Sequence, residues 1–435
     1  MQAGAAPYLH TLDFVAALLR EFNIGDRSNR WLGKTFDLAS AYRQMIVSET
    51  SAWAAYIAVY NPDTDRAEIY QMKALPFGAT KSVYSFLRVA HSLWYLGAKG
   101  LGLIWSSYFD DFICLSCETC ATIVSGCVQT FFDLLGWRVS GGDKDLPFND
   151  VFKALGVQIS LDNWTKGIVL MQNTEKRILE LSGCIDKALK EGTLSSAAAL
   201  SLRGRMQFAN SQVWGRASKI CLKQVTLHAY NNSSSKVCDA LAAALTTFRK
   251  VLNAGKSKEI IAGTNKPRFV FTDASFEPSD ASWPAGVGGV LYDENGKALR
   301  HFSYCLDKND LAVLGFPDHK QTVIFEAELI AVIVAVKLWK DDLLDRPVVI
   351  FVDNNSARDV AVSGSARTVT PLKLVNLLLT LEDEFSIIPW YARVPSKSNP
   401  ADEPSRSDKE IESLGQRAVK SEVEAAVQFI LSCIN

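Results

Sequence analysis

The sequence has no segment that is both long enough and apolar enough to cross a bilayer. Its most apolar helical stretch, Leu329 to Trp339, is well short of the about 20 residues that a transmembrane helix needs. The first residues, Met1 to Pro7, contain neither a basic group nor the apolar core of a signal peptide. Nine cysteines without a secretory signal are expected to stay reduced. We therefore expect an intracellular protein, in the cytoplasm or the nucleus, with no membrane partner.

The chain also lacks an excess of charge of either sign. Its 46 lysines and arginines nearly balance 47 aspartates and glutamates, which leaves a net charge of −1. Nucleic-acid-binding domains usually present a basic surface, so a protein of this composition needs a local basic track to bind nucleic acid. The length of 435 residues and the hydrophobic fraction of 48% indicate two or three domains with cores of their own.

Cysteine and histidine are arranged without the pairs that a structural metal site needs. The five histidines show no ligand spacing. Cys114, Cys117 and Cys120 are evenly spaced with Cys127 beyond them, which is a weak indication of zinc or of an iron–sulfur cluster. No second Cys/His pair accompanies them, and cysteine is a good small core residue. Packing is therefore the favoured interpretation.

The sequence does contain a pair of adjacent carboxylates in an apolar run. Asp110 and Asp111 lie between Tyr108 and Phe112, whereas carboxylates are rarely buried unless they are paired or bind a metal ion. The pattern predicts a β-hairpin with both acids at its turn, where their oxygens could hold divalent cations. Taken alone, such a pair is more often a solvated Asp-Asp turn.

Four other blocks accompany this pair. Lys34 to Met45 predicts a strand that ends at Asp37 and a turn into a helix, with Tyr42 five residues after the aspartate. Leu75 to Ala79 predicts a turn that opens a long helix. In chain order, FDLASAYRQ, LPFGATKSVYSF, YFDD, GWRVSGGDK and LGVQIS resemble the palm of a retrotransposon-type reverse transcriptase, over about residues 31–160.

This resemblance implies a magnesium-dependent polymerase site. Asp37 and Asp110 would hold two Mg²⁺ ions, for which Mn²⁺ could substitute, with Asp111 beside them. The other residues that it implicates would contact the incoming dNTP or the template–primer: Tyr42 at the sugar 2′ position, Phe77 and Gly78 at template and nucleotide, Lys144 near the triphosphate, and Leu155 with Gly156 in the primer grip.

The front of the chain departs from this family. Only 36 residues precede Asp37, where a reverse transcriptase has a fingers region whose basic residues clamp the triphosphate. Thr80 to Tyr84 is also atypical, because relatives often have a proline there. We expect the sequence to be a segment of a longer polyprotein or a degenerate copy, with the fingers largely missing.

The middle of the chain is expected to be helical. Apolar residues recur at helical spacing over three stretches, at 174–181, 194–209 and 238–252. Arg203, Arg205 and Arg216 are either part of a thumb or connection that grips a duplex backbone or ordinary solvated arginines. The pattern LRGR, FA and GRA resembles DIRS-like retroelements and related dinoflagellate retroelement polyproteins.

Four acids in the last third follow elements that could bring them together. Strands are predicted to end at Asp273 and Asp353, a helix over Thr322 to Asp342 carries Glu328, and a short helix begins near Asp402. Converging carboxylates are what a two-metal nuclease needs to hold its paired cations. Each acid taken alone is more often a solvated side chain or a helix cap.

The blocks TDAS, AELIAV, VDNNSA and NPADEPSR resemble an RNase H domain over about residues 266–410. The resemblance implies catalytic and Mg²⁺-binding roles for Asp273, Glu328, Asp353 and Asp402. Glu328 is preferred to its neighbour Glu326 because the Glu-Leu-x-Ala pattern of the family begins there. The loop from Arg393 to Pro400, just before Asp402, contains no histidine, although cellular RNases H carry one there.

We therefore expect a multidomain protein of the α+β and α/β classes. It would combine an antiparallel palm sheet with helices, a helical thumb or connection, and an RNase H-like mixed sheet flanked by helices. The expected function is RNA-directed DNA synthesis with hydrolysis of RNA in RNA–DNA hybrids. Alternatives are a degenerate nucleic-acid-binding remnant or a nuclease with a scaffold palm. The expected boundaries are 1–160 for the fingers remnant and palm, 161–252 for the thumb, 253–267 for a linker, 268–410 for RNase H and 411–435 for a terminal helix.

Overall fold

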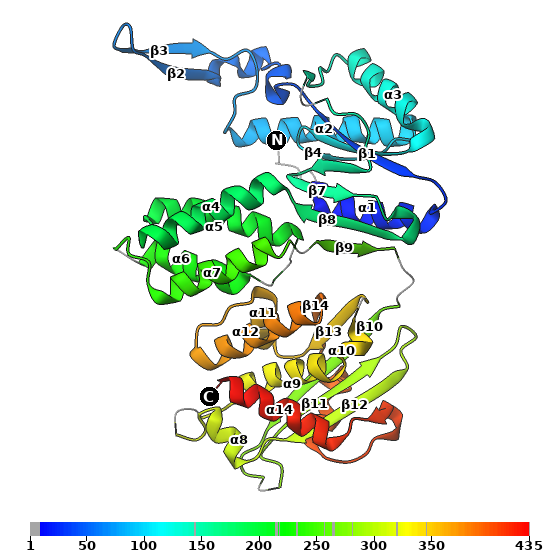
Figure 1. The fold of residues 1–435 in the computed structure, drawn as a ribbon, viewed down its shortest axis with the longest axis vertical. Helices are drawn as coiled ribbons and strands as arrows, with labels where there is room; N and C mark the ends of the chain where they lie inside the picture. Colours follow the sequence, from blue (N-terminus) through cyan, green and yellow to red (C-terminus); the bar gives the residue numbers. More distant parts are fainter. Residues whose placement is uncertain are drawn as a thin grey trace. The chain divides into compact units, whose positions relative to one another are not determined.

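The computed structural model separates into two compact units (Figure 1). The first is Met1–Ile178 with Gly255–Gly263, and the second is Leu179–Ala254 with Thr264–Asn435. The prediction of a multidomain α/β architecture with several sheets is confirmed. The residues that the structure describes are 9–142, 145–213, 216, 218–231, 234–255, 257–262, 266–280, 282–318, 321–344 and 346–434.

The first unit contains a three-stranded antiparallel sheet in the order β1-β5-β4. Its strands are β1 (Trp31–Asp37), β4 (Ile104–Tyr108) and β5 (Asp111–Cys117). The central strand β5 is buried from Phe112 to Ser116, which explains its continuous apolar run. Strands β4 and β5 pair with Tyr108 opposite Asp111, so the predicted hairpin is confirmed.

Two helices cover this sheet, α2 (Thr80–Gly100) and α3 (Ala121–Leu134). Helix α2 packs closely on β4, since the indole nitrogens of Trp94 and Trp105 each donate to the other's carbonyl oxygen at 2.8 and 3.0 Å. A Cβ atom at Gly97 would lie 2.0 Å from the Trp105 ring. A glycine is therefore needed at this helix position. The preceding segment contains a separate hairpin of β2 (Tyr56–Asn61) and β3 (Arg66–Gln71).

A second antiparallel sheet of the first unit has the order β6-β7-β8-β9. Residues 161–173, expected in the helical thumb, contain its strand β8, and the expected linker contains β9, which pairs with β8. No local pattern reveals this pairing, because the helices of the second unit intervene in the sequence. The strands are β6 (Val151–Ala154), β7 (Val157–Ser160), β8 (Ile168–Asn173) and β9 (Lys258–Ile261). The first unit also contains helix α1 (Leu12–Gly25).

The second unit begins with a group of helices. Their apolar sides are buried at positions such as Ile185, Met206, Val225 and Phe248. The helices are α4 (Glu175–Glu191), whose first four residues belong to the first unit, α5 (Ser196–Val213), α6 (Lys219–Asn231) and α7 (Asp239–Asn253).

The rest of the second unit is a six-stranded mixed sheet in the order β14-β13-β10-β11-β12-β15. Strands β10, β11 and β12 pair antiparallel. Strand β13 pairs parallel with β10, and β14 pairs parallel with β13. The strands are β10 (Arg268–Phe276), β11 (Ala285–Tyr292), β12 (Ala298–Cys305), β13 (Val348–Val352), β14 (Pro389–Arg393) and β15 (Gln416–Arg417).

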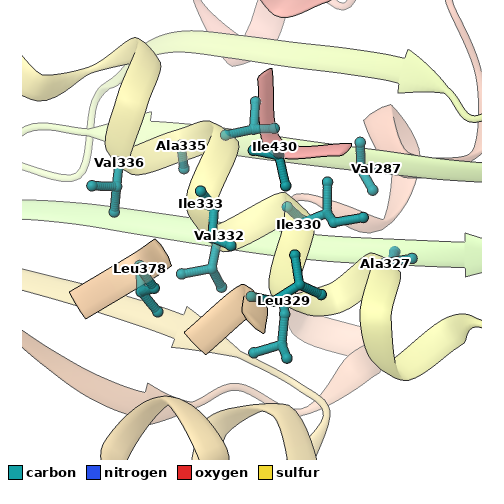
Figure 2. Packing of buried hydrophobic residues seen from close by; sticks show 14 of the residues in the cluster. Val287, Ala327, Leu329, Ile330, Val332, Ile333, Ala335, Val336, Leu378 and Ile430 are labelled. Atoms are coloured by element: carbon teal, nitrogen blue, oxygen red, sulfur yellow. The ribbon is translucent and has the colours of Figure 1, made fainter. Parts of the chain in front are cut away.

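Helix α9 (Ile324–Leu338) forms the centre of the core of this part. Every residue from Glu326 to Val336 is buried, and a helix that is apolar all round is expected to be enclosed. Figure 2 shows its side chains near Leu378 of α12, Ile430 of α14 and Val287 of β11. The other helices are α8 (Lys308–Val313), α10 (Lys340–Leu343), α11 (Asn355–Ser363), α12 (Val369–Glu384), α13 (Asp402–Arg406) and α14 (Lys420–Ile434).

A helix in the region of α9 and a terminal helix were expected from the sequence, whereas α11 was not. Helix α11 has nine residues, so any helical pattern in its sequence covers fewer than three turns. Across the described ranges, no helix combines the length and the apolar character that spanning a membrane requires.

Candidate active sites

Three carboxylates of the second unit converge at one edge of its sheet. Asp273 of β10, Glu328 of α9 and Asp353 after β13 each offer an oxygen that lies within 4.8 Å of the other two. Thr272 and Val352 are partners in the parallel pairing of β10 and β13, so the residues that follow them are neighbours. Among the residues that the structure describes, no other group of three potential metal ligands converges this closely.

Burial and the charges of neighbouring carboxylates raise the pKa values of two of these residues, Asp273 and Glu328. Burial raises the pKa of Asp273 to about 7, and the charges of Asp353 and Asp402 add to the shift, while a hydrogen bond from Ser405 opposes it. Burial also raises the pKa of Glu328 to about 10, with further contributions from Asp353 and Asp273. Three ionised carboxylates at this spacing need a positive charge between them.

The donor set fits a divalent cation. Oε2 of Glu328 is buried and has no hydrogen-bond partner, although buried polar atoms are normally paired. Carboxylate oxygens are the ligands that Mg²⁺ and Mn²⁺ prefer. Asp273, Glu328 and Asp353 are therefore the residues that would hold such an ion.

Asp402 lies beside the trio but is outside it. Its side chain is 46% exposed, and its Oδ1 accepts a hydrogen bond of 3.0 Å from Nε of Arg406. Arg406 also forms an ion pair of 3.0 Å with Glu277. The structure thus brings together three of the four acids, and it places Asp402 near enough for its charge to affect Asp273.

Two residues that the sequence prediction missed hold the Asp273 carboxylate. Nδ2 of Asn399 donates to Oδ1 of Asp273 at 3.2 Å and to the Thr272 carbonyl at 3.0 Å. The Ser405 hydroxyl donates to Oδ2 of Asp273 at 2.7 Å. Asn399 and Ser405 are buried and flank Asp402 in the block that was assigned to this acid alone.

Glycines of β11 allow Ser405 to approach Asp273 closely enough for this hydrogen bond. A Cβ atom at Gly288 would lie 2.5 Å from the backbone nitrogen of Ser405, and one at Gly286 would lie 2.0 Å from its carbonyl oxygen. Helix α13 therefore lies directly on the β11 backbone. The repeated glycines in Gly286-Val-Gly288 are the sequence signal for this close approach.

The three predicted catalytic aspartates of the first unit, Asp37, Asp110 and Asp111, lie at one end of its three-stranded sheet. Asp37 is paired with Asp111 in the register of β1 and β5. Asp110 lies in the turn, and its carbonyl accepts a hydrogen bond of 3.0 Å from the Leu38 amide. Oδ2 of Asp37 accepts a hydrogen bond of 2.6 Å from the Ser140 hydroxyl. Their oxygens do not form a convergent trio of the kind found in the second unit.

Aromatic residues border these aspartates. The Tyr42 ring stacks on Phe86 with 4.7 Å between centroids and lies 5.0 Å from the Phe77 ring. Burial, and then the charge of Asp110, raise the pKa of Tyr42. Gly78 has a φ of +84° just before α2. The structure therefore brings Tyr42 and Phe77 together and places Tyr42 close to Asp110.

The expected primer-grip residues form the turn between β6 and β7. Leu155 and Gly156 have φ values of 47° and 73°, and Ala154 and Val157 pair across the turn. Two left-handed central residues are typical of a two-residue hairpin. Strand β6 adjoins β1, since the Thr35 hydroxyl donates to the Lys153 carbonyl at 2.8 Å. Lys144 lies outside the described residues.

The cysteine cluster does not form a metal site within the described part of the chain. Cys114 is fully buried, and its burial raises the pKa of the thiol to about 12. A thiol in this environment stays neutral and packs as a small apolar group. The favoured interpretation of Cys114 as a core residue agrees with its position.

No protein-family model matches the chain, and no curated protein sequence matches it. Solved structures of a foamy viral protease–reverse transcriptase are similar at 17% identity. For its complex with an RNA/DNA hybrid the TM-score is 0.45, over 94% of this chain and 49% of the viral one. For a form in complex with double-stranded DNA the TM-score is 0.42, over 86% and 59%. The chain thus spans about half the length of these proteins.

Proposed function

We propose that the second unit is a metal-dependent nuclease that hydrolyses the RNA strand of RNA–DNA hybrids. The observation that carries this proposal is the convergence of one carboxylate oxygen each from Asp273, Glu328 and Asp353, all within 4.8 Å of one another. Asp402 would complete the ligand set after separating from Arg406. The bound pair of Mg²⁺ ions would activate water and neutralise the leaving oxygen.

The residues of the chain prepare this site in distinct ways. Asn399 and Ser405 fix the two oxygens of Asp273, so that its orientation is set before a cation binds. Burial keeps Glu328 protonated at neutral pH without a cation, and cation binding would displace this proton. Arg406, once separated from Asp402, would be available to a phosphate of the nucleic acid.

The first unit extends the proposal to nucleotide addition. Asp37 and Asp110 would hold the two metal ions of a polymerase, and Tyr42 would lie against the sugar of the incoming dNTP. The support is the pairing of Asp37 with Asp111 and the proximity of Tyr42 to Asp110. The whole chain would then act on a template–primer as a retroelement reverse transcriptase with a tethered RNase H.

A nuclease with a scaffold palm is the second candidate. It is favoured by one difference between the units: the acids of the second unit form a convergent trio, and in the described part of the first unit none is found. In this case hybrid cleavage would be present and nucleotide addition absent. A binding remnant would have neither activity.

Two assays on one preparation separate these functions. The first follows Mg²⁺-dependent extension of a DNA primer on an RNA template, and Asp110→Asn should abolish it. The second follows cleavage of the RNA strand in a labelled hybrid, and Asp273→Asn should abolish it. Each variant serves as the control for the other assay. A folded wild type without cleavage in Mg²⁺ or Mn²⁺ would overturn the nuclease proposal.

A further inference from the structure

Helix α11 connects Asp353 to helices α4 to α7, which form the helical part of the second unit. At its first turn, Oδ1 of Asn354 accepts hydrogen bonds from the amides of Ser356 and Ala357 at 3.0 and 3.1 Å. Asn354 is the residue after Asp353, so the N-terminus of α11 and the carboxylate are directly linked. Any displacement of this helix along its axis would therefore move Asp353.

Basic side chains from the helical part bind the other end of α11. The carbonyl oxygens of the last turn of a helix lack partners within the helix. Here the Ala361 carbonyl accepts from Nη2 of Arg216, and the Val362 carbonyl accepts from Nζ of Lys219 at 3.0 Å. Cations are also favoured at this end by the helix dipole.

The chain beyond α11 continues this contact. Nζ of Lys223 donates to the Ala366 carbonyl at 3.1 Å. Gly364 has a φ of 66°, and a Cβ atom there would lie 2.9 Å from Cδ of Lys219. Gly364 is thus required both by the left-handed conformation and by the path of Lys219. Arg216 lies in a turn, and Lys219 and Lys223 lie in helix α6.

Arg216 is itself anchored in a buried network. Its Nε lies 3.5 Å from Oε2 of Glu382, whose side chain is 5% exposed. Its guanidinium group lies 5.1 Å from the centroid of the Tyr391 ring, and the Tyr391 hydroxyl donates to Glu382 at 2.6 Å. Arg216 therefore contacts α11, α12 and β14 together. The Arg216 guanidinium group therefore has its partners within the protein, and a nucleic-acid phosphate is not needed to explain its positive charge.

We propose that Arg216, assisted by Lys219 and Lys223, is a positioning residue of the nuclease site. It fixes the C-terminal end of α11, and through this helix it sets the orientation in which Asp353 binds a cation. The inference rests on the proposed cation site, and it adds a role for the helical part that the acids alone do not imply. The competing account is that these contacts only stabilise packing.

The test compares full-length Arg216→Met with Arg216→Lys. Arg249→Met is the matched control, because Arg249 pairs with Asp186 on an exposed side of the same helical part. Hydrogen exchange of the α11 amides and the affinity for Mn²⁺ by calorimetry are measured on each. We expect Arg216→Met to increase α11 exchange, to weaken Mn²⁺ binding about tenfold and to lower kcat with little change in KM. Arg216→Lys should restore part of the affinity.

A double variant, Lys219→Met with Lys223→Met, keeps the buried ion pair and should show the same changes to a smaller extent. It provides the test if Arg216→Met fails to fold. Unchanged Mn²⁺ affinity in folded variants would overturn the positioning role, whatever happens to stability. A wild type that binds no Mn²⁺ would instead overturn the proposed cation site. The two failures are therefore distinguishable.

Discussion

Ser405 donates a hydrogen bond of 2.7 Å from its hydroxyl to Oδ2 of Asp273. The two residues are far apart in the sequence, and α13 brings them together by lying on the glycines of β11. The carboxylate of Asp273 is thus held from outside the trio that would bind a cation. Several expected results follow from this arrangement and from the pKa shifts around it.

Removal of the Ser405 hydroxyl should weaken cation binding. In Ser405→Ala, Oδ2 of Asp273 loses a donor that favours its ionised form, so the pKa of Asp273 should rise further above 7. We expect the Mn²⁺ affinity at pH 7 to fall about tenfold. Calorimetric titration checks this, with Ser398→Ala, at an exposed position before α13, as the control. Equal affinities in the two variants would show that the hydrogen bond does not position Asp273.

Stability of the cation-free protein should decrease as the pH rises. The pKa of Asp273 is raised from 3.8 to about 7, and that of Glu328 from 4.5 to about 10. Between the unfolded and folded values the folded state holds more protons than the unfolded state, so the free energy of unfolding falls with increasing pH. The loss should begin near pH 4 and continue beyond pH 7.

Glu328→Gln should accordingly stabilise the second unit in EDTA at pH 8, because the folded wild type must keep the Glu328 carboxyl protonated at a pH where the unfolded chain has it ionised. A gain of about 1 kcal/mol would raise Tm by about 2–4 °C for a unit of this size. Thermal unfolding from pH 4 to pH 9 measures the effect. A Glu328→Gln variant with the same pH dependence as the wild type would contradict the assignment of the shift to this residue.

Cation binding should release protons. At pH 7 the carboxyl group of Glu328 is protonated, and Asp273 is partly protonated, because of their raised pKa values. A bound divalent cation requires ionised ligands, so at least about one proton should leave for each site that is filled. Calorimetry in buffers with different enthalpies of ionisation measures this number. A binding enthalpy that is independent of the buffer would argue against protonated ligands.

Gly288→Ala should displace α13. The added Cβ atom would lie 2.5 Å from the backbone nitrogen of Ser405, where backbone rather than a flexible side chain must shift. We expect a loss of about 1–3 kcal/mol in the free energy of unfolding of the second unit, together with weaker Mn²⁺ binding. Gly126→Ala in α3 is the control, since its Cβ would meet nothing within 4 Å. Denaturant unfolding of both variants decides whether the close approach matters.

Tyr42 should affect the choice of sugar if the first unit adds nucleotides. Its ring packs on Phe86 and lies near Asp110, which suits contact with the 2′ position of a nucleotide. Tyr42→Ala should therefore reduce the preference for dNTPs over ribonucleotides by about tenfold or more. The ratio of the two kcat/KM values measures this preference, with Tyr42→Phe as the control. An unchanged ratio would place the sugar elsewhere.

The elements that carry the acids were predictable because their signals are local. Asp110 lies within an apolar run that forms a hairpin, and Asp353 follows a strand rich in β-branched residues. Their convergence with residues on other elements depends on strand register and on the packing of α9, which spacing alone does not encode. The family resemblance supplied the grouping of Glu328 with Asp273.

The remaining features were not predictable for physical reasons. Strand β9 pairs with β8 although helices α4 to α7 lie between them in the sequence. Such non-local pairing leaves no pattern in a four-residue strand. Asn399 acts through a hydrogen bond to Asp273, and an amide in a loop resembles any turn residue. Arg216 was expected to bind a duplex or to be solvated, whereas the structure places it in a buried network with Glu382.

The measurement that tests the central claim most directly is Mg²⁺-dependent cleavage of the RNA strand in a labelled RNA–DNA hybrid. Wild type is compared with Asp353→Asn, which keeps the shape of the side chain and removes its charge. Asp341→Asn, at an exposed position of α10, is the matched control. We predict cleavage by wild type and Asp341→Asn and a loss of at least about 100-fold in Asp353→Asn. Equal cleavage by all three, or none by a folded wild type, would contradict the assignment of the acidic trio as the catalytic site.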